Sequence, residues 1–154
     1  MPQSKAKLLW DLTSEFILAI GFHISLYQEE GCGDGIYFAH TGKCYIVSND
    51  QKNWNAARDK CMERRCGDLA TIADQQTLDF IKNNIALKNT HTWIGAERSS
   101  GEWKWADGTP WSFTAWGNLI EKENWVDPAI IYSADYKWYN QVAGNSKYPY
   151  ICQY

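Results

Sequence analysis

The sequence lacks the motifs that mark most enzyme active sites. It contains no G-x-S-x-G, no H-E-x-x-H and no phosphate-cradling G-x-x-x-x-G-K. Its three histidines, His23, His40 and His91, lie in three separate segments, and none belongs to a Cys/His nucleophile pattern. No pair of carboxylates is marked as a tuned acid and base. We therefore predict that the chain is not an enzyme.

An excess of positive charge is also missing. The formal net charge is −3 at pH 7, and no cluster of Lys and Arg stands out along the chain. A surface that binds nucleic acid needs such a cluster to neutralise the phosphates. We therefore expect no nucleic-acid partner.

The sequence is poor in long apolar runs. The stretch 16–27 follows Lys5 and Lys7, and it is short for a membrane span but suits the core of a signal peptide. Asp11 and Glu15 interrupt the basic start that a signal peptide prefers. We interpret residues 1–30 as an N-terminal segment that is a signal peptide or a signal anchor. The alternative is a segment that packs on the domain or on a partner, and we expect membrane contact only from an anchor.

Cysteine pairs with metal-binding spacing are absent. No C-x-x-C occurs, and no His pair follows at zinc-finger spacing, so we expect no zinc site. Cysteines among Trp-rich strands with few charges are typical of a domain that is secreted or displayed outside the cell. The number is odd, so one thiol is left over. The five cysteines are Cys32, Cys44, Cys61, Cys66 and Cys152.

Aromatic residues, by contrast, are abundant, with nine Trp and nine Tyr in 154 residues. This length fits one domain with a substantial core, which we place at residues 31–154, after a glycine-rich break at 31–35. Two short strands, 36–38 and 44–47, flank a turn and predict a hairpin. Cys32 and Cys44 flank this hairpin, so their side chains could meet across it.

Two amphipathic helices follow the hairpin. Trp54, Ala57 and Cys61 recur on one face of the first, for which Asn49 or Asp50 is the expected N-cap. A short extended segment at 68–72 follows. In the second helix Asp74 is the expected N-cap, and the apolar face carries Leu78, Ile81 and Ile85. Strands and loops follow Trp93 and end in a strand at 150–152, so the fold class is α+β, with two helices and antiparallel sheets.

Several spaced motifs occur together in a recognisable order. They are Trp-x-x-Ala-Arg-x-x-Cys at 54–61, Gly-Asp-Leu-Ala-Thr-Ile at 67–72, Trp-Ile-Gly at 93–95, Trp-Lys-Trp-Ala-Asp-Gly at 103–108 and Tyr-Pro-Tyr-Ile-Cys at 148–152. Together they resemble the C-type lectin-like domain over about residues 32–153. The resemblance implies a double-loop fold in which Cys61 pairs with Cys152. It also implies that Cys32 and Cys44 form the extra hairpin bridge of the family's long form.

The same resemblance implies a long upper loop, about Trp111 to Trp138, that presents the ligand face. The family usually braces this loop with a second core disulfide. Its cysteines would fall at Trp125 and near Ala143 or Gly144, and neither position is Cys here. We interpret Trp125 as packing over the small residue in place of the covalent brace.

The calcium-binding triplets of the sugar-binding members are altered. The first, Glu-Pro-Asn or Gln-Pro-Asp, is missing from residues 116–123, where Lys122 adds a positive charge. The second reads Trp138-Tyr139-Asn140, so Tyr replaces an amide ligand and Asn replaces a carboxylate. Calcium needs about six to eight oxygen ligands. We expect no cofactor, and any remaining calcium contact would come from Glu121, Glu123 and Asn140.

We interpret the acidic residues of this loop as solvated. The alternative is a shifted calcium site formed by Glu121, Glu123, Asn124 and Asp127. Among the aromatic residues, Trp105, Trp116 and Trp138 match core positions of the family. Others should be partly exposed, where flat rings suit protein contacts and sugar stacking. The predicted ligand-binding residues are Trp111, Glu121, Glu123, Asn124, Tyr132, Tyr136, Tyr139 and Asn140.

These features predict an extracellular module that binds a protein or glycoprotein ligand without calcium. The alternative is a carbohydrate-binding lectin with a remodelled or calcium-independent sugar site. Cys66 is the cysteine left over from the two pairs that the resemblance implies. It is either a buried small hydrophobe or the link of a covalent homodimer, and spacing alone leaves open that it pairs with another cysteine.

Overall fold

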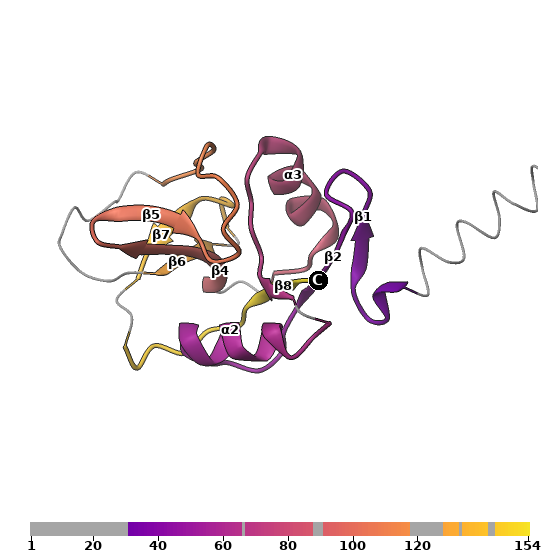
Figure 1. Cartoon of the computed structure of the whole chain (residues 1–154), viewed down its shortest axis with the longest axis horizontal. Helices are drawn as coiled ribbons and strands as arrows, with labels where there is room; N and C mark the ends of the chain where they lie inside the picture. Colours follow the sequence, from indigo (N-terminus) through magenta and orange to yellow (C-terminus); the bar gives the residue numbers. More distant parts are fainter. Residues whose placement is uncertain (1–30, 66, 88–90, 118–127, 133, 142–143) are drawn as a thin grey trace, which may run out of the picture.

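The computed structural model describes residues 31–65, 67–87, 91–117, 128–132, 134–141 and 144–154. The N-terminal segment 1–30 therefore lies outside the described residues. Within the described ranges, none of the helices has both the length and the apolar character that a bilayer crossing requires. The described residues form two helices and two four-stranded antiparallel sheets (Figure 1), which is the α+β arrangement that the sequence predicts.

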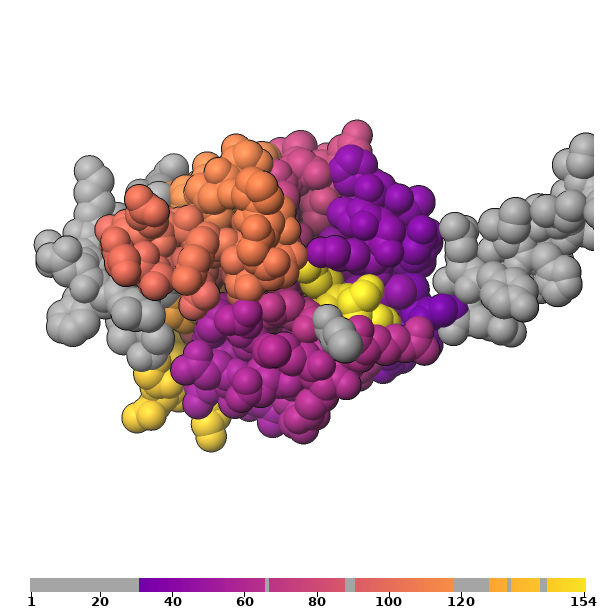
Figure 2. Space-filling view, in the orientation of Figure 1, coloured from indigo at the N-terminus to yellow at the C-terminus, as the bar shows by residue number. Residues whose placement is uncertain are grey.

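The first sheet joins the two ends of the domain, with strand order β1-β2-β8-β3. Its strands are β1 (Ile36–Phe38), β2 (Lys43–Val47), β3 (Asp68–Leu69) and β8 (Ile151–Gln153). The predicted hairpin is confirmed, and Gly42 adopts a φ of 67° in its turn, a conformation that glycine accepts without strain. The last strand begins one residue later than predicted. In the space-filling view the C-terminal strand, in yellow, lies between the indigo hairpin and the magenta region of α2 (Figure 2).

The two helices begin where a side chain can cap them. Helix α3 (Gln75–Asn84) begins after Asp74, whose carboxylate accepts a hydrogen bond from the Thr77 backbone, as predicted. Helix α2 (Trp54–Met62) is capped by Asn53. The prediction of Asn49 or Asp50 was wrong because the helix begins later, and the Asn53 Oδ1 atom accepts from the Ala56 amide at 2.9 Å.

The second sheet has the strand order β5-β4-β6-β7. Its strands are β4 (His91–Ser99), β5 (Glu102–Trp105), β6 (Pro128–Tyr132) and β7 (Trp138–Asn140). Strand β6 pairs with both β4 and β7 in the middle of this sheet. The predicted loop from Trp111 to Trp138 is therefore wrong at its C-terminal end, because a buried central strand begins at Pro128.

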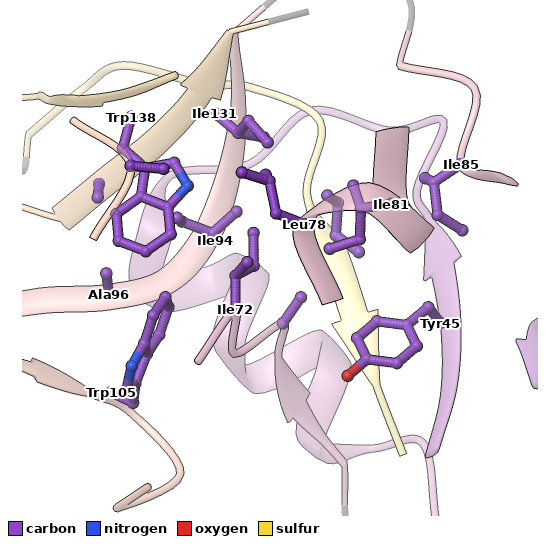
Figure 3. Packing of buried hydrophobic residues seen from close by; sticks show 14 residues of the cluster. Tyr45, Ile72, Leu78, Ile81, Ile85, Ile94, Ala96, Trp105, Ile131 and Trp138 are labelled. Atoms are coloured by element: carbon purple, nitrogen blue, oxygen red, sulfur yellow. The ribbon is translucent and has the colours of Figure 1, made fainter. Parts of the chain in front are cut away.

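The main core lies between α3 and one face of the second sheet (Figure 3). Leu78 and Ile81 of α3 point toward Ile94 and Ile131 of the sheet, and Tyr45 of β2 lies at one end of this core. A second cluster lies between α2 and the opposite sheet face, where Trp54, Ala57 and Cys61 pack as their spacing predicts. The second sheet thus separates two apolar clusters, and each of its faces contributes side chains to one of them.

Two disulfides hold the ends of the domain. Cys32 pairs with Cys44 and Cys61 pairs with Cys152, as the family resemblance implies. The second bond connects α2 to β8 across 91 residues, and both of its cysteines are buried in the second cluster. In the chain-entropy model, closing a loop of this length contributes about 4–5 kcal/mol to stability. Cys66 lies outside the described residues.

Candidate functional site

The register of the second sheet separates the candidate aromatic residues onto two faces. Successive strand residues point to opposite faces, so Trp138 and Tyr139 of β7 diverge. Trp138 lies opposite Ile131 and is fully buried in the main core. Tyr139 lies opposite Ile130 and packs against the second cluster. The aromatic residues that were predicted to share one ligand face therefore lie on two opposite faces of the sheet.

Indole rings gather on the side of the sheet that Trp138 occupies. We name the half-buried side chains there the tryptophan face; they are Trp103, Trp111, Phe113 and Trp116. The Trp103 and Trp116 ring centroids are 4.6 Å apart, and the Trp103 and Trp111 rings are stacked at 6.1 Å. Beneath them lie two fully buried rings, Trp105 and Trp138, as predicted, whereas Trp116 is more exposed than its expected core position. The partial exposure predicted for Trp111 is confirmed.

A half-buried carboxylate fixes the segment that leads to the tryptophan face. Asp107 accepts hydrogen bonds from the Thr109 amide at 3.0 Å, the Lys43 ammonium at 3.2 Å and the Gln153 amide at 2.7 Å. Burial alone would raise its pKa, but the hydrogen bonds, Thr109 foremost, lower the pKa of Asp107 to about 2. The carboxylate is therefore ionised at neutral pH and holds residues 107–109 against β2 and β8.

A row of rings occupies the opposite face of the sheet. We name it the tyrosine strip, and its members are His91, Tyr132, Tyr139 and Tyr148. The Tyr132 ring centroid is 5.1 Å from His91 and 6.4 Å from Tyr139, and His91 is 5.3 Å from Tyr148. Tyr132 is 36% exposed, and the other three side chains are half-buried. The exposure predicted for Tyr132 and Tyr139 is therefore observed, on a different face from Trp111.

Tyr136 belongs to neither surface. It lies in the turn between β6 and β7, with a φ of 54°, and packs against the main core beside α3. The Lys82 ammonium is 5.9 Å from its ring centroid, within the range of a cation–π contact. Tyr136 is half-buried, as predicted, but it is directed to the α3 side of the sheet, away from Tyr132.

The altered triplet in β7 has a defined hydrogen-bond arrangement. The Tyr139 hydroxyl donates to the Asp135 carboxylate at 2.6 Å, and this bond raises the pKa of Tyr139. The Tyr139 ring fills the space that a side chain at residue 117 would need, which is glycine in this chain. Asn140 is half-buried and has a partner in the fold. The position of the family's amide ligand is thus filled by a phenol that already has a hydrogen-bond acceptor.

The acidic half of the predicted site lies outside the described residues. This applies to Glu121, Glu123, Asn124 and Asp127, and also to Trp125 and Ala143 at the altered disulfide positions. Among the residues that the structure describes, no three His, Cys, Asp or Glu side chains come together as metal ligands. The candidate calcium contacts therefore stay predictions.

Four aromatic residues of the two surfaces were not among the predicted ligand-binding residues. Trp103 and Phe113 join the tryptophan face, and His91 and Tyr148 join the tyrosine strip. The spacing in β5 was the available signal for Trp103, because a residue two positions before the buried Trp105 shares its face. His91 and Tyr148 could be placed only from the pairing of β4 with β6 and from their ring contacts.

Known proteins share the sequence pattern of this chain. The family model for the lectin C-type domain matches residues 50–154. The chain belongs to the C-type lectin domain family. A relative, C-type lectin lectoxin-Lio3 from Erythrolamprus poecilogyrus, is 31% identical over 148 residues, covering 89% of this chain and 90% of the relative. C-type lectin-like domains are generally binding domains for protein or glycan ligands.

Solved structures of other proteins share the architecture. The carbohydrate-recognition domain of cow CD23, determined in the presence of a GlcNAc2Man3 oligosaccharide, matches with a TM-score of 0.66 and 24% identity, covering 79% of this chain and 93% of that chain. A calcium-independent type II antifreeze protein matches with a TM-score of 0.66 and 24% identity, covering 80% and 93%. At this identity the likeness shows the fold alone, so the ligand must be argued from the side chains.

Proposed function

We propose that this C-type lectin domain is an extracellular, non-catalytic module that binds a protein or glycoprotein ligand without calcium. The tryptophan face, at the base of the long loop, is its contact surface. The observation that carries the proposal is the bond between Tyr139 and Asp135. A calcium site of the family's kind needs an amide oxygen at residue 139, and this chain has an aromatic ring with a committed hydroxyl there.

The composition of the tryptophan face supports a protein ligand. Contact surfaces between proteins concentrate their binding energy in a few aromatic and Arg side chains near the centre of the patch. Trp103, Trp111 and Trp116 form such a cluster, with ring centroids between 4.6 and 6.3 Å apart. Buried Trp105 and Trp138 support these rings from below, so little side-chain entropy is lost when a ligand covers them.

The alternative function is carbohydrate binding at the remodelled loop. Its support is the relative named C-type lectin that spans nearly the whole chain. Its predicted polar contacts are Glu121, Glu123, Asn124 and Asn140. Calcium dependence would separate a remodelled calcium site from the calcium-free module that we propose.

The first experiment titrates calcium into the full chain by calorimetry. We expect no binding heat at about millimolar calcium, the weak end of protein calcium sites. Heat that disappears in Glu123→Gln would refute calcium independence and favour the remodelled lectin site.

The second experiment measures binding of the labelled full chain to intact cells in the presence of a chelator. Trp111→Ala should lower binding at least about tenfold, as expected for a central aromatic contact. Tyr37→Ala, which removes a half-buried ring from β1, is the matched control. Protease treatment of the cells should abolish binding. Binding that survives protease but is lost after glycosidase treatment would contradict a protein ligand.

A further inference from the structure

Strand β5 lies at the edge of the second sheet and pairs only with β4 among the described strands (Figure 1). The Ala106 amide donates to the Gly95 carbonyl at 2.7 Å, which fixes the hydrogen-bond pattern of this ladder. Hydrogen-bonded and non-hydrogen-bonded pairs alternate along antiparallel strands, so Lys104 also bonds to β4, whereas Trp103 and Trp105 do not. The backbone N–H and C=O of Trp103 are therefore directed to the open edge.

The edge at Trp103 has the backbone geometry that another strand requires. Unpaired backbone groups at a sheet edge are a template for strand pairing. The Trp105 carbonyl accepts from the Gly108 amide at 3.1 Å, and within the described ranges no strand pairs with β5 on this side. A residue whose N–H and C=O both face an antiparallel partner exchanges two hydrogen bonds with one residue of that partner. Pairing at this edge is therefore centred on Trp103.

The side chains of β5 determine which strand can pair with it. Trp103 and Trp105 pack on the main-core side of the sheet, so Glu102 and Lys104 point to the opposite side, where both are exposed. Charges on an edge strand exclude most partners, and opposite charges across a strand pair stabilise it. An antiparallel partner thus needs an apolar residue opposite Trp103, an acidic residue opposite Lys104 and a basic residue opposite Glu102.

The sequence of β5 meets this requirement itself. In an antiparallel pair centred on Trp103, Glu102 of each copy lies opposite Lys104 of the other copy. The strand is therefore complementary to a second copy of itself, as a two-fold symmetric interface requires. The Lys104 side chain is 54% exposed, and its ammonium is 3.8 Å from the Glu97 carboxylate, so it can form a closer contact with a second copy.

We propose that this domain forms a symmetric homodimer in which β5 pairs with β5 of a second copy. The two Trp103 residues exchange backbone hydrogen bonds, and a Glu102–Lys104 contact lies on each side of them. The second sheets of the two copies continue into each other, so the two tryptophan faces lie side by side on the same surface. This pairing uses the edge of β5 and does not rest on the protein ligand proposed above.

The size of the contact sets the strength of the dimer. A stable interface buries about 800 Å² from each partner, and two paired strands of four residues bury less. The dimer should therefore be reversible, with a Kd on the order of 0.1 mM.

The test is sedimentation equilibrium of the full chain carrying Cys66→Ala, which excludes a dimer linked through that cysteine. We expect a monomer at about 5 µM and mostly dimer at about 0.5 mM. Glu102→Lys and Lys104→Glu should each weaken self-association at least about tenfold, because like charges then face each other twice. An equal mixture of the two variants should associate again, because their charges are complementary in the antiparallel register.

The control is Lys147→Glu, which makes the same change of charge at an exposed residue outside β5 and should leave self-association unchanged. Melting temperatures of the variants equal to that of the parent chain would exclude unfolding as the cause. At about 5 µM, where the chain is monomeric, Lys104→Glu should keep the cell-surface binding that Trp111→Ala loses, so the ligand proposal and the dimer proposal can fail separately.

Three results would overturn the dimer proposal. The first is a chain that stays monomeric at about 0.5 mM. The second is self-association that both charge variants leave unchanged, which would place the contact on another surface. The third is a mixture of the two variants that stays monomeric, which would exclude the antiparallel register centred on Trp103.

Discussion

The contribution of the Asp107 carboxylate to the stability of the domain can be tested quantitatively. Its carboxylate joins the hairpin, the last strand and the start of the tryptophan-bearing segment through Lys43, Gln153 and Thr109. We consider Asp107→Asn, which keeps the size of the side chain and removes its charge. The change weakens the Lys43 contact and places an amide where the Gln153 amide donates. Hydrogen bonds that involve a charged group contribute about 1.5–3 kcal/mol each, so we expect a loss of about 2 kcal/mol at neutral pH.

The pH dependence follows from the depressed pKa. Asp107 titrates at about 2 in the folded domain instead of 3.8, so its ionised form is stabilised by folding. The contribution is complete above the ordinary Asp pKa and is lost as pH falls through about 2. The shift corresponds to at most about 2.5 kcal/mol. The side chain is 15% exposed, and solvent screening reduces the value to about 1–2 kcal/mol.

The assay is urea unfolding of the wild-type and Asp107→Asn chains from about pH 7 to about pH 2. The difference in unfolding free energy between them should be largest at neutral pH and should shrink as Asp107 of the wild type becomes protonated. Glu102→Gln, which removes the charge of an exposed carboxylate on β5, is the matched control. A difference that stays constant over the whole pH range would refute the assigned role of the Asp107 charge.

Two further predictions concern stability. Replacing both Cys61 and Cys152 by Ala should lower the unfolding free energy by about 4–5 kcal/mol, measured by denaturant titration, and an unchanged midpoint would contradict the loop-closure account. Gly95→Ala places a Cβ atom 2.7 Å from the Leu69 carbonyl oxygen, so it should destabilise the domain by about 1–3 kcal/mol in thermal unfolding. Gly144→Ala has open space around its Cβ and should leave the melting temperature nearly unchanged, and equal effects at both glycines would contradict steric crowding at Gly95.

Local patterns made most of the fold predictable. The faces of α2 and α3 follow from apolar residues that recur at helical spacing, and Asp74 lies directly before the first helical residue it caps. Asn53 was missed because several residues before Trp54 have side chains that can cap a helix. Strand β6 was missed because it lies in a segment rich in aromatic and polar residues. Its Pro128 is tolerated as the first strand residue.

The candidate site was harder to predict than the fold. Partial exposure of Trp111, Tyr132 and Tyr139 follows from the number of rings that one small core can hold. Their division between two faces depends on which residue of β6 pairs with which residue of β7, and a shift of one residue would exchange the faces. That register is set by long-range packing around Trp138, which the order of residues along the chain does not reveal.

The position of β8 has a consequence for the order in which the domain assembles during synthesis. Strand β8 lies between β2 and β3, so the first sheet cannot close until residues 151–153 have been made. Cys32 and Cys44 are close in sequence and can pair early. Cys61 pairs with Cys152, which is synthesised 91 residues later, and Cys66 lies near Cys61 in the sequence. Because β8 is synthesised last and the Cys61 thiol is free until then, transient pairing of the wrong cysteines is favoured. Efficient production of this domain should therefore depend on disulfide exchange, more than on the rate at which its helices form.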